Sequence, residues 1–443
     1  MRFNKSLLWV GLVTYFILTG CNLTIITETA RPSSNANPPT AIIIDPAITS
    51  TSPATPEPSH TPKPQGIWGR LANPEFENER IKTSLFFAGQ SRDGSSRYGC
   101  SASSNLDLYT VHPNDTRNRT WSQHVENRDF VIDQMVSAGL NVVSMSSWGE
   151  DFLPCDASWV PSAPMQTAPG AHDELFTAAV SKHLLIIPFI ESRADWAFRD
   201  EFPYWSDGSL APGTQSQIIN LIDRYLKNPA HPEWADSWAQ VYDRNHEPRY
   251  AVTIIHASSN QLKAGDDQAF AAGFDLLAET VFQATDVRVG FFIDTLPPNS
   301  NAPGKFKPSP EKTGSMLFQT NAILGIQSFI PEIWVSGSPS ESQLIRWKKD
   351  YSRRWLETGI PFLMDISPGY NASIVFPASI RYGFSTNWQD ALTGMVTDYG
   401  EDGLAFNSWN GYTEGMAAVP TLEYGDRYYR WLQATCGLVD SKL

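Results

Sequence analysis

The sequence has few basic residues, few histidines and few cysteines. Its 443 residues include 33 Lys and Arg against 47 Asp and Glu, which gives a formal net charge of −14. Because phosphate backbones require a basic surface, this balance excludes nucleic acid as an expected partner. The 8 His form no His-x-x-x-His or His-Glu-x-x-His pair, and the acids lack the spacing of an EF-hand loop. We therefore expect no metal site and no other cofactor. Binding of a Ca²⁺ ion by scattered loop oxygens is not excluded by the sequence.

The sequence also lacks a hydrophobic run long enough to span a membrane comfortably. The apolar run at residues 7–18 follows Arg2 and Lys5, which is the arrangement of a secretory signal peptide. It ends in Leu-Thr-Gly-Cys, which resembles the bacterial lipobox in which Cys21 becomes the lipidated first residue. We expect residues 1–20 to be a lipoprotein signal peptide and Cys21 to anchor an exported protein to a bilayer, at the cell surface or in the envelope. An ordinary signal peptide with a chance cysteine is the alternative.

The stretch that follows this signal has too few apolar residues to form a core. Residues 21–66 are mainly Ser, Thr, Pro and Ala, and such a composition cannot bury enough apolar surface to offset the entropy of ordering. We expect a disordered stalk here. The remaining residues, 67–443, are long enough to bury a large core, and we expect them to form one folded domain and a monomer.

The folded part alternates regularly between short apolar stretches and amphipathic stretches. Eight strands, each followed by a helix, are the number that a (β/α)8 TIM barrel requires. No glycine-rich loop follows the first strand, where a nucleotide-binding open sheet would place one, so the barrel is favoured over a doubly wound sheet. The expected strands are residues 84–88, 141–145, 184–190, 251–255, 287–293, 325–330, 361–364 and 403–406, and the helices are residues 127–137, 172–181, 215–226, 267–283, 313–321, 343–356, 388–397 and 428–435.

The barrel also makes a prediction for the remaining cysteines. Cys100 and Cys155 fall in two loops on the same face, and export permits a disulfide between them. Cys436 lies in an apolar terminal helix and is expected to be a buried thiol.

Acids and aromatic residues gather where the expected strands end. The acids are Glu150, Asp151, Glu191, Asp294, Glu332, Asp365 and Glu414. Glycoside cleavage needs one acid to protonate the leaving oxygen and a second to stabilise or attack the anomeric centre, and aromatic rings suit the sugar subsites. We therefore predict catalytic roles for Glu414, Glu191, Asp294 and Glu332, and substrate binding by Trp148, His256, Trp334, Asp365, Tyr370, Trp409, Asn410 and Tyr412.

Each of these residues has a structural alternative. Acids at strand ends often cap the next helix or pair with a neighbouring arginine, which applies to Asp365 and to Asp151. Glu191 has Arg193 two residues further on. His256 fits a hydrogen-bonded rim residue as well as it fits a base.

The stretch around Glu414 resembles a known family. Residues 409–415, Trp-Asn-Gly-Tyr-Thr-Glu-Gly, look like the Asn-Glu-Trp-His-Glu-Gly signature of the glycoside hydrolase family 99 endo-α-mannosidases and their bacterial relatives. Ser-Trp-Gly at 147–149 and Ser-Pro-Gly-Tyr at 367–370 agree in order and spacing. The resemblance implies a (β/α)8 barrel that cuts α-mannosidic links internally, with Glu414 as the general acid/base. The family's first acid falls on Gly411, so another rim acid must serve or the mechanism must differ.

The sequence therefore predicts a surface-anchored glycoside hydrolase that acts on a poly- or oligosaccharide. The first alternative is a non-catalytic glycan-binding lipoprotein, in which the loss at Gly411 marks a degenerate active site. The second is a barrel hydrolase of another class, such as a deacetylase or a metal-dependent amidase. The absence of clustered histidines makes this second alternative the weaker one.

Overall fold

A computed structural model of the chain describes residues 66–88, 109–121, 124–147, 171–191, 212–255, 265–295, 306–374 and 380–442. All of them belong to one compact unit, His60–Leu443. The predicted signal peptide, Cys21, residues 22–65 of the predicted stalk, and the cysteines 100 and 155 lie outside the described residues.

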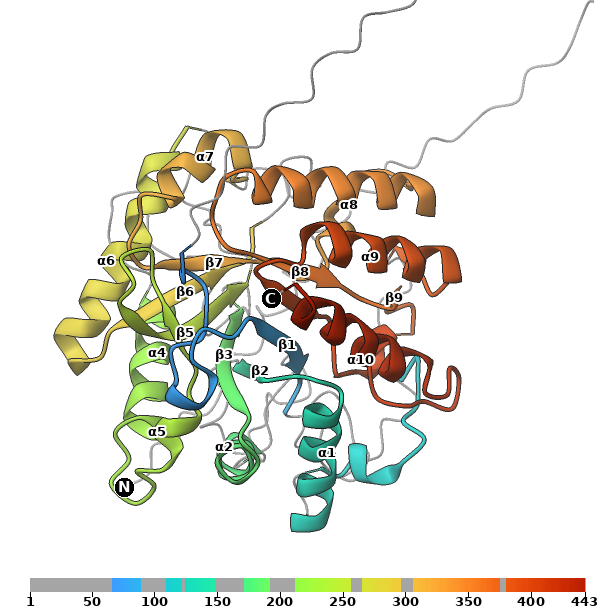
Figure 1. Cartoon of the computed structure of the whole chain (residues 1–443), viewed down its shortest axis with the longest axis horizontal. Helices are drawn as coiled ribbons and strands as arrows, with labels where there is room; N and C mark the ends of the chain where they lie inside the picture. Colours follow the sequence, from blue (N-terminus) through green and yellow to red (C-terminus); the bar gives the residue numbers. More distant parts are fainter. Residues whose placement is uncertain are drawn as a thin grey trace, which may run out of the picture. The chain divides into compact units, whose positions relative to one another are not determined.

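Parallel strands at the centre of the domain close on themselves to form a barrel (Figure 1). Around the ring the order is β1, β2, β3, β5, β6, β7, β8 and β11, and β11 returns to β1 in parallel register. Each predicted strand overlaps one of them, so the predicted (β/α)8 fold is confirmed. Their bounds are Ile81–Phe86 (β1), Val142–Ser147 (β2), Leu185–Glu191 (β3), Pro248–Ile255 (β5), Val289–Ile293 (β6), Ile323–Gln327 (β7), Phe362–Ile366 (β8) and Gly403–Phe406 (β11).

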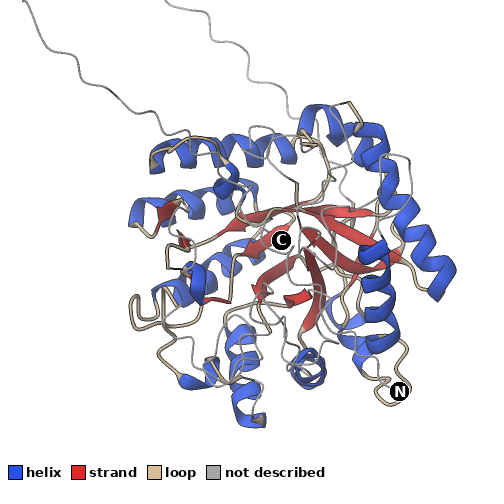
Figure 2. Cartoon of the chain, turned by 180° about the vertical axis from the view of Figure 1, so that it is seen from behind, coloured by secondary structure: helices blue, strands red, loops and turns tan. Residues whose placement is uncertain are grey.

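Helices surround the strands, as Figure 2 shows from behind. All eight predicted helices are present among the described residues. They are Val125–Ser137 (α1), Ala171–Lys182 (α2), Pro212–Tyr225 (α4), Asp267–Thr285 (α6), Pro310–Leu317 (α7), Glu341–Leu356 (α8), Thr386–Tyr399 (α9) and Arg427–Asp440 (α10). None of the described helices is both long and apolar enough to cross a membrane.

Several bounds differ from the prediction for local reasons. Helix α7 begins three residues before the predicted start, because Ser309 caps it by accepting a hydrogen bond from Lys312 N and Pro310 occupies its first turn. Strand β7 ends at Gln327 and not at Ile330, whose φ of 38° is left-handed and cannot continue a strand.

Small elements at both ends of the barrel were not predicted. At the amino end, β4 (Gln240–Tyr242) pairs antiparallel with β5, preceded by the short helix α5 (Trp234–Ser237). At the carboxyl end, two short antiparallel pairs follow β8 and β11. They are β9 (Gly369–Asn371) with β10 (Arg381–Gly383), and β12 (Asn410–Gly411) with β13 (Met416–Ala417). Short 3₁₀ helices are Pro74–Phe76 (η1), Thr116–Asn118 (η3), Pro331–Trp334 (η6) and Tyr412–Glu414 (η7).

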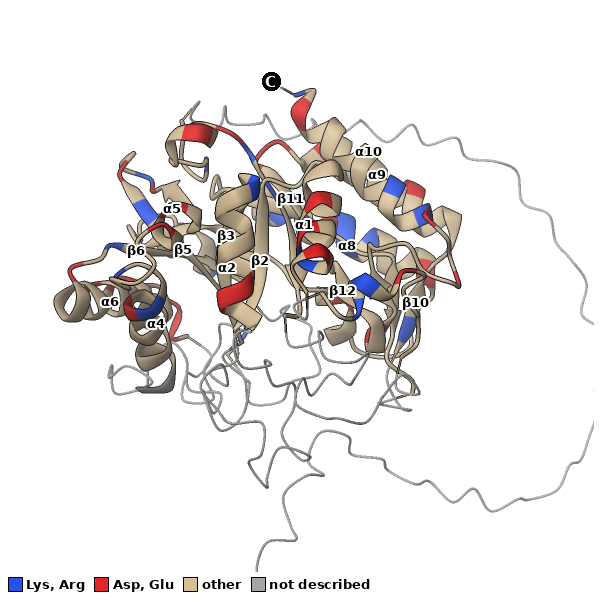
Figure 3. Ribbon diagram, turned by 90° about the horizontal axis from the view of Figure 1, so that it is seen from below, with Lys and Arg blue, Asp and Glu red and all other residues tan. Residues whose placement is uncertain are grey.

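The barrel interior is packed, with a polar layer between two apolar ones. One apolar cluster includes Leu363 and Ala405, and another includes Leu85 and Phe189 nearer the carboxyl ends. Between them, the hydroxyl groups of Thr83 and Ser144 lie 2.9 Å apart, and the Gln327 amide bonds Ser144 and Thr253 from across the barrel. Charged residues lie mainly on the helices and loops outside the strands (Figure 3). The centre is therefore a core, and chemistry must take place at its ends.

Cys436 of α10 is a free, buried cysteine, which confirms the prediction for it. Burial raises the pKa of its thiol to about 12.

Candidate functional site

The carboxyl end of β11 leads into a short reversal that carries Glu414 at its tip. After Phe406 the chain forms β12, turns through η7, and returns as β13, which pairs with β12. Gly415 ends η7 in the left-handed conformation, with φ of 71°. A Cβ at that position would lie 3.0 Å from the Phe384 ring, so glycine suits both the backbone and the space.

This reversal is tied to β1 by the side chain of Asn410. Its Oδ1 accepts from Phe87 N at 2.8 Å, and its Nδ2 donates to Phe87 O at 3.0 Å. The backbone of Trp409 adds a bond from its N–H to Leu85 O at 2.7 Å. Asn410 thus extends β1 in the manner of a strand partner, and both ends of its amide are used within the fold. Its predicted contact with substrate stays a prediction.

A second segment, residues 109–111, holds the other side of the reversal. The backbone N–H groups of Thr110 and Val111 donate to Tyr412 O at 2.9 and 3.2 Å. The Thr110 hydroxyl donates to Thr413 O at 3.0 Å. Glu414 therefore lies, half-buried, on a backbone that these hydrogen bonds hold in place. A defined position is what a general acid requires, but its catalytic role stays a prediction.

At Gly411, where the resemblance places the family's first acid, the fold has no room for a side chain. A Cβ there would lie 2.5 Å from Ser408 Oγ and 3.1 Å from Met416 O. Ser408 is not free to move aside without loss, because its hydroxyl donates to Met416 O at 2.7 Å. The departure from the family pattern therefore coincides with close contacts to Ser408 and Met416 around this position.

Two of the predicted site acids, Glu332 and Asp365, belong to a buried charge cluster with Lys348. Lys348 reaches from α8 and forms ion pairs with both carboxylates. The second oxygen of Asp365 accepts from the amide of Asn407, and the Tyr382 hydroxyl donates to Glu332 at 3.3 Å. The exposed fractions of Glu332 and Asp365 are 0% and 1%. We refer to Lys348, Glu332 and Asp365 as the charge cluster.

Burial and charge act against each other in this cluster. Burial raises the pKa of Asp365 to about 7, Lys348 opposes the rise, and the neighbouring Glu332 adds to it. Burial alone would lower the pKa of Lys348, but the two carboxylates outweigh it and raise that pKa above its ordinary value. The hydroxyl of Tyr382 has its pKa raised well above the ordinary value by burial and then by Glu332. Lys348 is thus the cation for both carboxylates. The predicted roles of Glu332 and Asp365 toward a substrate stay predictions.

Asp294 ends β6 near the same group of side chains. Its Oδ1 accepts from Phe329 N at 3.0 Å, and only 2% of the residue is exposed. Burial, and then the charge of Asp294, raise the pKa of Tyr351 to about 12. The Tyr351 hydroxyl lies 3.2 Å from that of Ser328. Because Phe292 belongs to the interior cluster, Asp294 shares its inward face of the strand, as predicted for a rim acid. Its role stays a prediction.

The predicted aromatic residues that the structure describes are mostly buried against other side chains. Trp409 is fully buried and meets Tyr429 edge-on, with 6.3 Å between ring centroids. Tyr412 is buried 5.1 Å from the Tyr109 ring. Tyr370 stacks on Tyr382 at 6.2 Å, while Trp334, at the end of η6, is half-buried. Stacking on a sugar requires an accessible ring face, so these predictions stay untested by the described contacts.

Other predicted residues cannot be placed. Trp148 and His256 lie outside the described residues, as do Glu150 and Asp151. Glu191 is the last residue of β3, at the carboxyl end as expected, but its side chain is outside the description.

Lys348, which the sequence reasoning missed, was detectable. It lies on the same helix face as Leu344, Tyr351 and Trp355, all of them buried. A lysine within an apolar stripe predicts a buried partner of opposite charge. Asn407 and Tyr382, which complete the hydrogen bonding of the cluster, gave no comparable signal.

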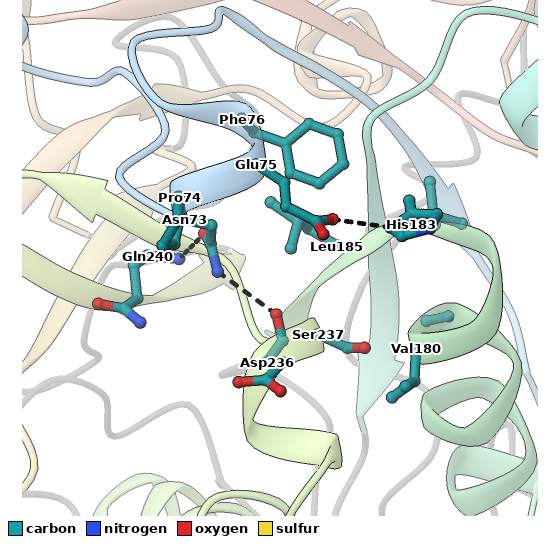
Figure 4. A pocket seen from close by; sticks show the side chains of 12 residues that line it. Asn73, Pro74, Glu75, Phe76, Val180, His183, Leu185, Asp236, Ser237 and Gln240 are labelled. Atoms are coloured by element: carbon teal, nitrogen blue, oxygen red, sulfur yellow. Dashed lines mark hydrogen bonds and ion pairs between the residues drawn. The ribbon is translucent and has the colours of Figure 1, made fainter.

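Elsewhere the described residues offer little for metal chemistry or small-molecule binding. Among them, no three His, Cys, Asp or Glu side chains come together as a group that could hold a metal ion. A cavity of about 350 Å³ lies at the amino ends of the strands, between η1 and α2 (Figure 4). There His183 Nδ1 lies 2.7 Å from Glu75 Oε2, and both side chains are more than half exposed. This cavity is at the opposite end from Glu414 and adds nothing to that site.

Comparison with known proteins gives similarity in structure only. No family model matches the sequence, and no curated protein matches it. The fold is similar to that of the GH99 endo-α-mannosidase from Bacteroides thetaiotaomicron, with 16% identity and a TM-score of 0.50 over 82% of this chain and 97% of that chain. A structure of the same kind of enzyme with bis-tris propane gives 14% and 0.48 over 82% and 96%. The endo-1,4-β-mannanase from Rhizomucor miehei gives 12% and 0.44 over 82% and 95%. The resemblance drawn from residues 409–415 is thus confirmed at the level of the barrel fold.

Proposed function

We propose that the barrel is a glycoside hydrolase that cleaves a poly- or oligosaccharide at the carboxyl ends of its strands, with Glu414 as the general acid/base. The observation that carries the proposal is the position of Glu414. It lies on a short helix whose backbone is fixed by Thr110 on one side and by the turn at Gly415 on the other. The barrel likeness to a GH99 endo-α-mannosidase and the motif at residues 409–415 support the same class of reaction.

The second carboxylate of this reaction is the open part of the mechanism. Position 411 has no space for it. Glu332 already shares Lys348 with Asp365, and a carboxylate held in an ion pair is a poorer nucleophile or base. We therefore favour Asp294 and Glu191, which end strands β6 and β3.

The experiment uses the full-length chain on a panel of α- and β-linked polysaccharides, with products read by mass spectrometry. Glu414→Gln is expected to lose about 100-fold or more in rate, since that is the usual contribution of a general acid. Glu279→Gln is the matched control, because Glu279 is exposed on α6, away from the strand ends. Cleavage that survives in Glu414→Gln would refute the assignment of the acid.

A non-catalytic glycan-binding function is the second candidate, and the closed position 411 favours it. In that case no polysaccharide is cut, some glycan binds, and Glu414→Gln changes the affinity little. The same panel, read by affinity electrophoresis, separates the two functions.

We further propose that the protein is exported as a monomeric lipoprotein, with residues 1–20 as the signal peptide, Cys21 as the lipidated residue and residues 21–66 as a stalk. The support is the charged and apolar pattern before Cys21. Labelling with a radioactive fatty acid in a bacterial host should mark the natural chain and not Cys21→Ala. Equal labelling of both would contradict the anchor.

A further inference from the structure

A second cavity at the amino ends of the strands has an unusual charge for this protein. It measures about 530 Å³, and its walls include Trp68, Arg70, Arg80, Arg244, His246 and Phe318. Three arginines therefore line one cavity, beside the two acids Glu401 and Asp402, in a chain whose formal net charge is −14. Basic residues thus outnumber acidic ones here, against the overall balance of the chain.

These arginines are held by neutral oxygen atoms. Arg80 is buried and donates to the backbone carbonyls of Glu401, Val439 and Lys442, at 2.7, 3.4 and 3.0 Å. Arg244 donates to Phe318 O at 2.7 Å. Within the described part of the chain, neither they nor Arg70 form an ion pair with a carboxylate, which is unusual for a buried arginine such as Arg80.

Arg70 is the least satisfied of the three. Its Nη2 donates to Glu401 O at 3.2 Å, but its Nη1 is buried and has no hydrogen-bond partner. Burial and then the nearby Arg80 lower the pKa of Arg70, against the attraction of Asp402 and Glu401. Glu401 and Asp402 also line the cavity, so the lowered pKa of Arg70 already takes their negative charges into account. The positive charge on Arg70 remains incompletely neutralised, and an anion in the cavity would offset it.

We propose that this cavity binds a phosphate group carried on a small organic molecule or on a lipid. A phosphate offers several acceptor oxygens to guanidinium donors, which bind it with fixed geometry. The cavity is larger than a free ion needs, and one wall is apolar. Trp68 and Phe318 meet there edge-on, with 5.4 Å between their ring centroids. The arginines would hold the phosphate, and the two rings would contact the organic part.

The test measures binding to the full-length chain by isothermal titration calorimetry, with inorganic phosphate and glycerol 3-phosphate as probes. Saturable binding is expected, weaker at high salt because the charges are screened. Arg70→Gln and Arg244→Gln should each weaken it by ~10-fold or more, the usual contribution of one charge-assisted hydrogen bond. Arg430→Gln is the matched control, since Arg430 is 75% exposed on α10 and should change nothing.

A third arm uses vesicles of phosphatidylglycerol against vesicles of phosphatidylcholine. Binding to the anionic vesicles alone, lost in Arg70→Gln, would assign the phosphate to a lipid headgroup, whereas binding of glycerol 3-phosphate would assign it to a soluble ester. Circular dichroism shows whether each variant is folded, and Arg244→Gln carries the test if Arg70→Gln is not. The proposal is overturned if no probe binds saturably, or if folded variants of Arg70 and Arg244 bind as tightly as the natural chain.

Discussion

Replacing Lys348 with methionine tests the charge cluster directly. Lys348 is 1% exposed and is the cation that Glu332 and Asp365 share. Methionine has a similar length and no charge, so the substitution leaves the packing of α8 largely in place. It removes the partner of two buried carboxylates. Breaking a buried ion pair in this way typically costs about 3–5 kcal/mol of the free energy of unfolding.

The pH dependence gives the prediction its sign. In the folded protein the pKa of Asp365 is about 7, above its ordinary value of 3.8. The folded state therefore binds the extra proton, and the stability that this group contributes is present below pH 3.8 and is lost as the pH rises through about 7. Lys348 lowers that pKa, so its removal moves the pKa of Asp365 higher and extends the loss to higher pH. The difference between Lys348→Met and the natural chain should be larger at about pH 8 than at about pH 5.

Urea unfolding followed by tryptophan fluorescence at both pH values measures this difference. Lys349→Met is the matched control, because Lys349 is the next residue, is 55% exposed, and pairs with Asp398 at 3.3 Å. Its loss should change the free energy of unfolding by no more than about 0.5 kcal/mol. Adding Glu332→Gln and Asp365→Asn to Lys348→Met should recover most of the stability, since no buried charge then lacks a partner. A loss below about 1 kcal/mol, or one independent of pH, would refute the reasoning.

Three further predictions concern single positions. Gly411→Ala should lower the free energy of unfolding, measured in urea, by about 1–3 kcal/mol, because its Cβ would lie 2.5 Å from Ser408 Oγ. The loss should be smaller in a Ser408→Ala background, and an equal loss in both backgrounds would contradict the clash. Asn410→Asp places a carboxylate against Phe87 O, so its destabilisation should grow as the pH rises, and a pH-independent effect would argue against the paired hydrogen bonds. Native Cys436 should resist iodoacetamide near pH 8 and react after denaturation, by peptide mapping, because burial raises its pKa to about 12; rapid native labelling would contradict this.

The architecture was predictable because it depends on local patterns. Short apolar stretches alternate with amphipathic ones, and this alternation survives in every barrel strand and its following helix. Errors occurred where the backbone conformation of one residue decides the outcome. Ile330 looks like a strand residue, but its left-handed φ of 38° starts η6 and ends the strand early. The small hairpins, such as β12 with β13, depend on contacts with remote segments and had no local signal.

The site was predictable only in part, because burial at a barrel rim is decided by distant segments. The sequence placed Asp294 and Asp365 at strand ends, where they are. It did not predict that α8 would bring Lys348 onto Asp365. Nor did it predict that residues 109–111 would cover Tyr412, or that Trp409 would face Tyr429 of the terminal helix. The type and order of residues along the chain do not indicate which of these aromatic rings stays exposed to solvent.

The position of Glu414 constrains where its proposed partner acid can lie. Two carboxyl groups that act on one glycosidic bond flank it, at a separation of about 5–9.5 Å. From β11 the ring runs through β1 and β2 to β3 in one direction, and through β8 and β7 to β6 in the other. Glu191 and Asp294 therefore end the strands that lie third from β11 on either side, nearly across the mouth. Asp365 lies near the end of the adjacent strand β8, but its carboxylate is already paired with Lys348. The close contacts at position 411 and the ion pairs of Glu332 and Asp365 therefore favour a partner acid at the end of β3 or β6.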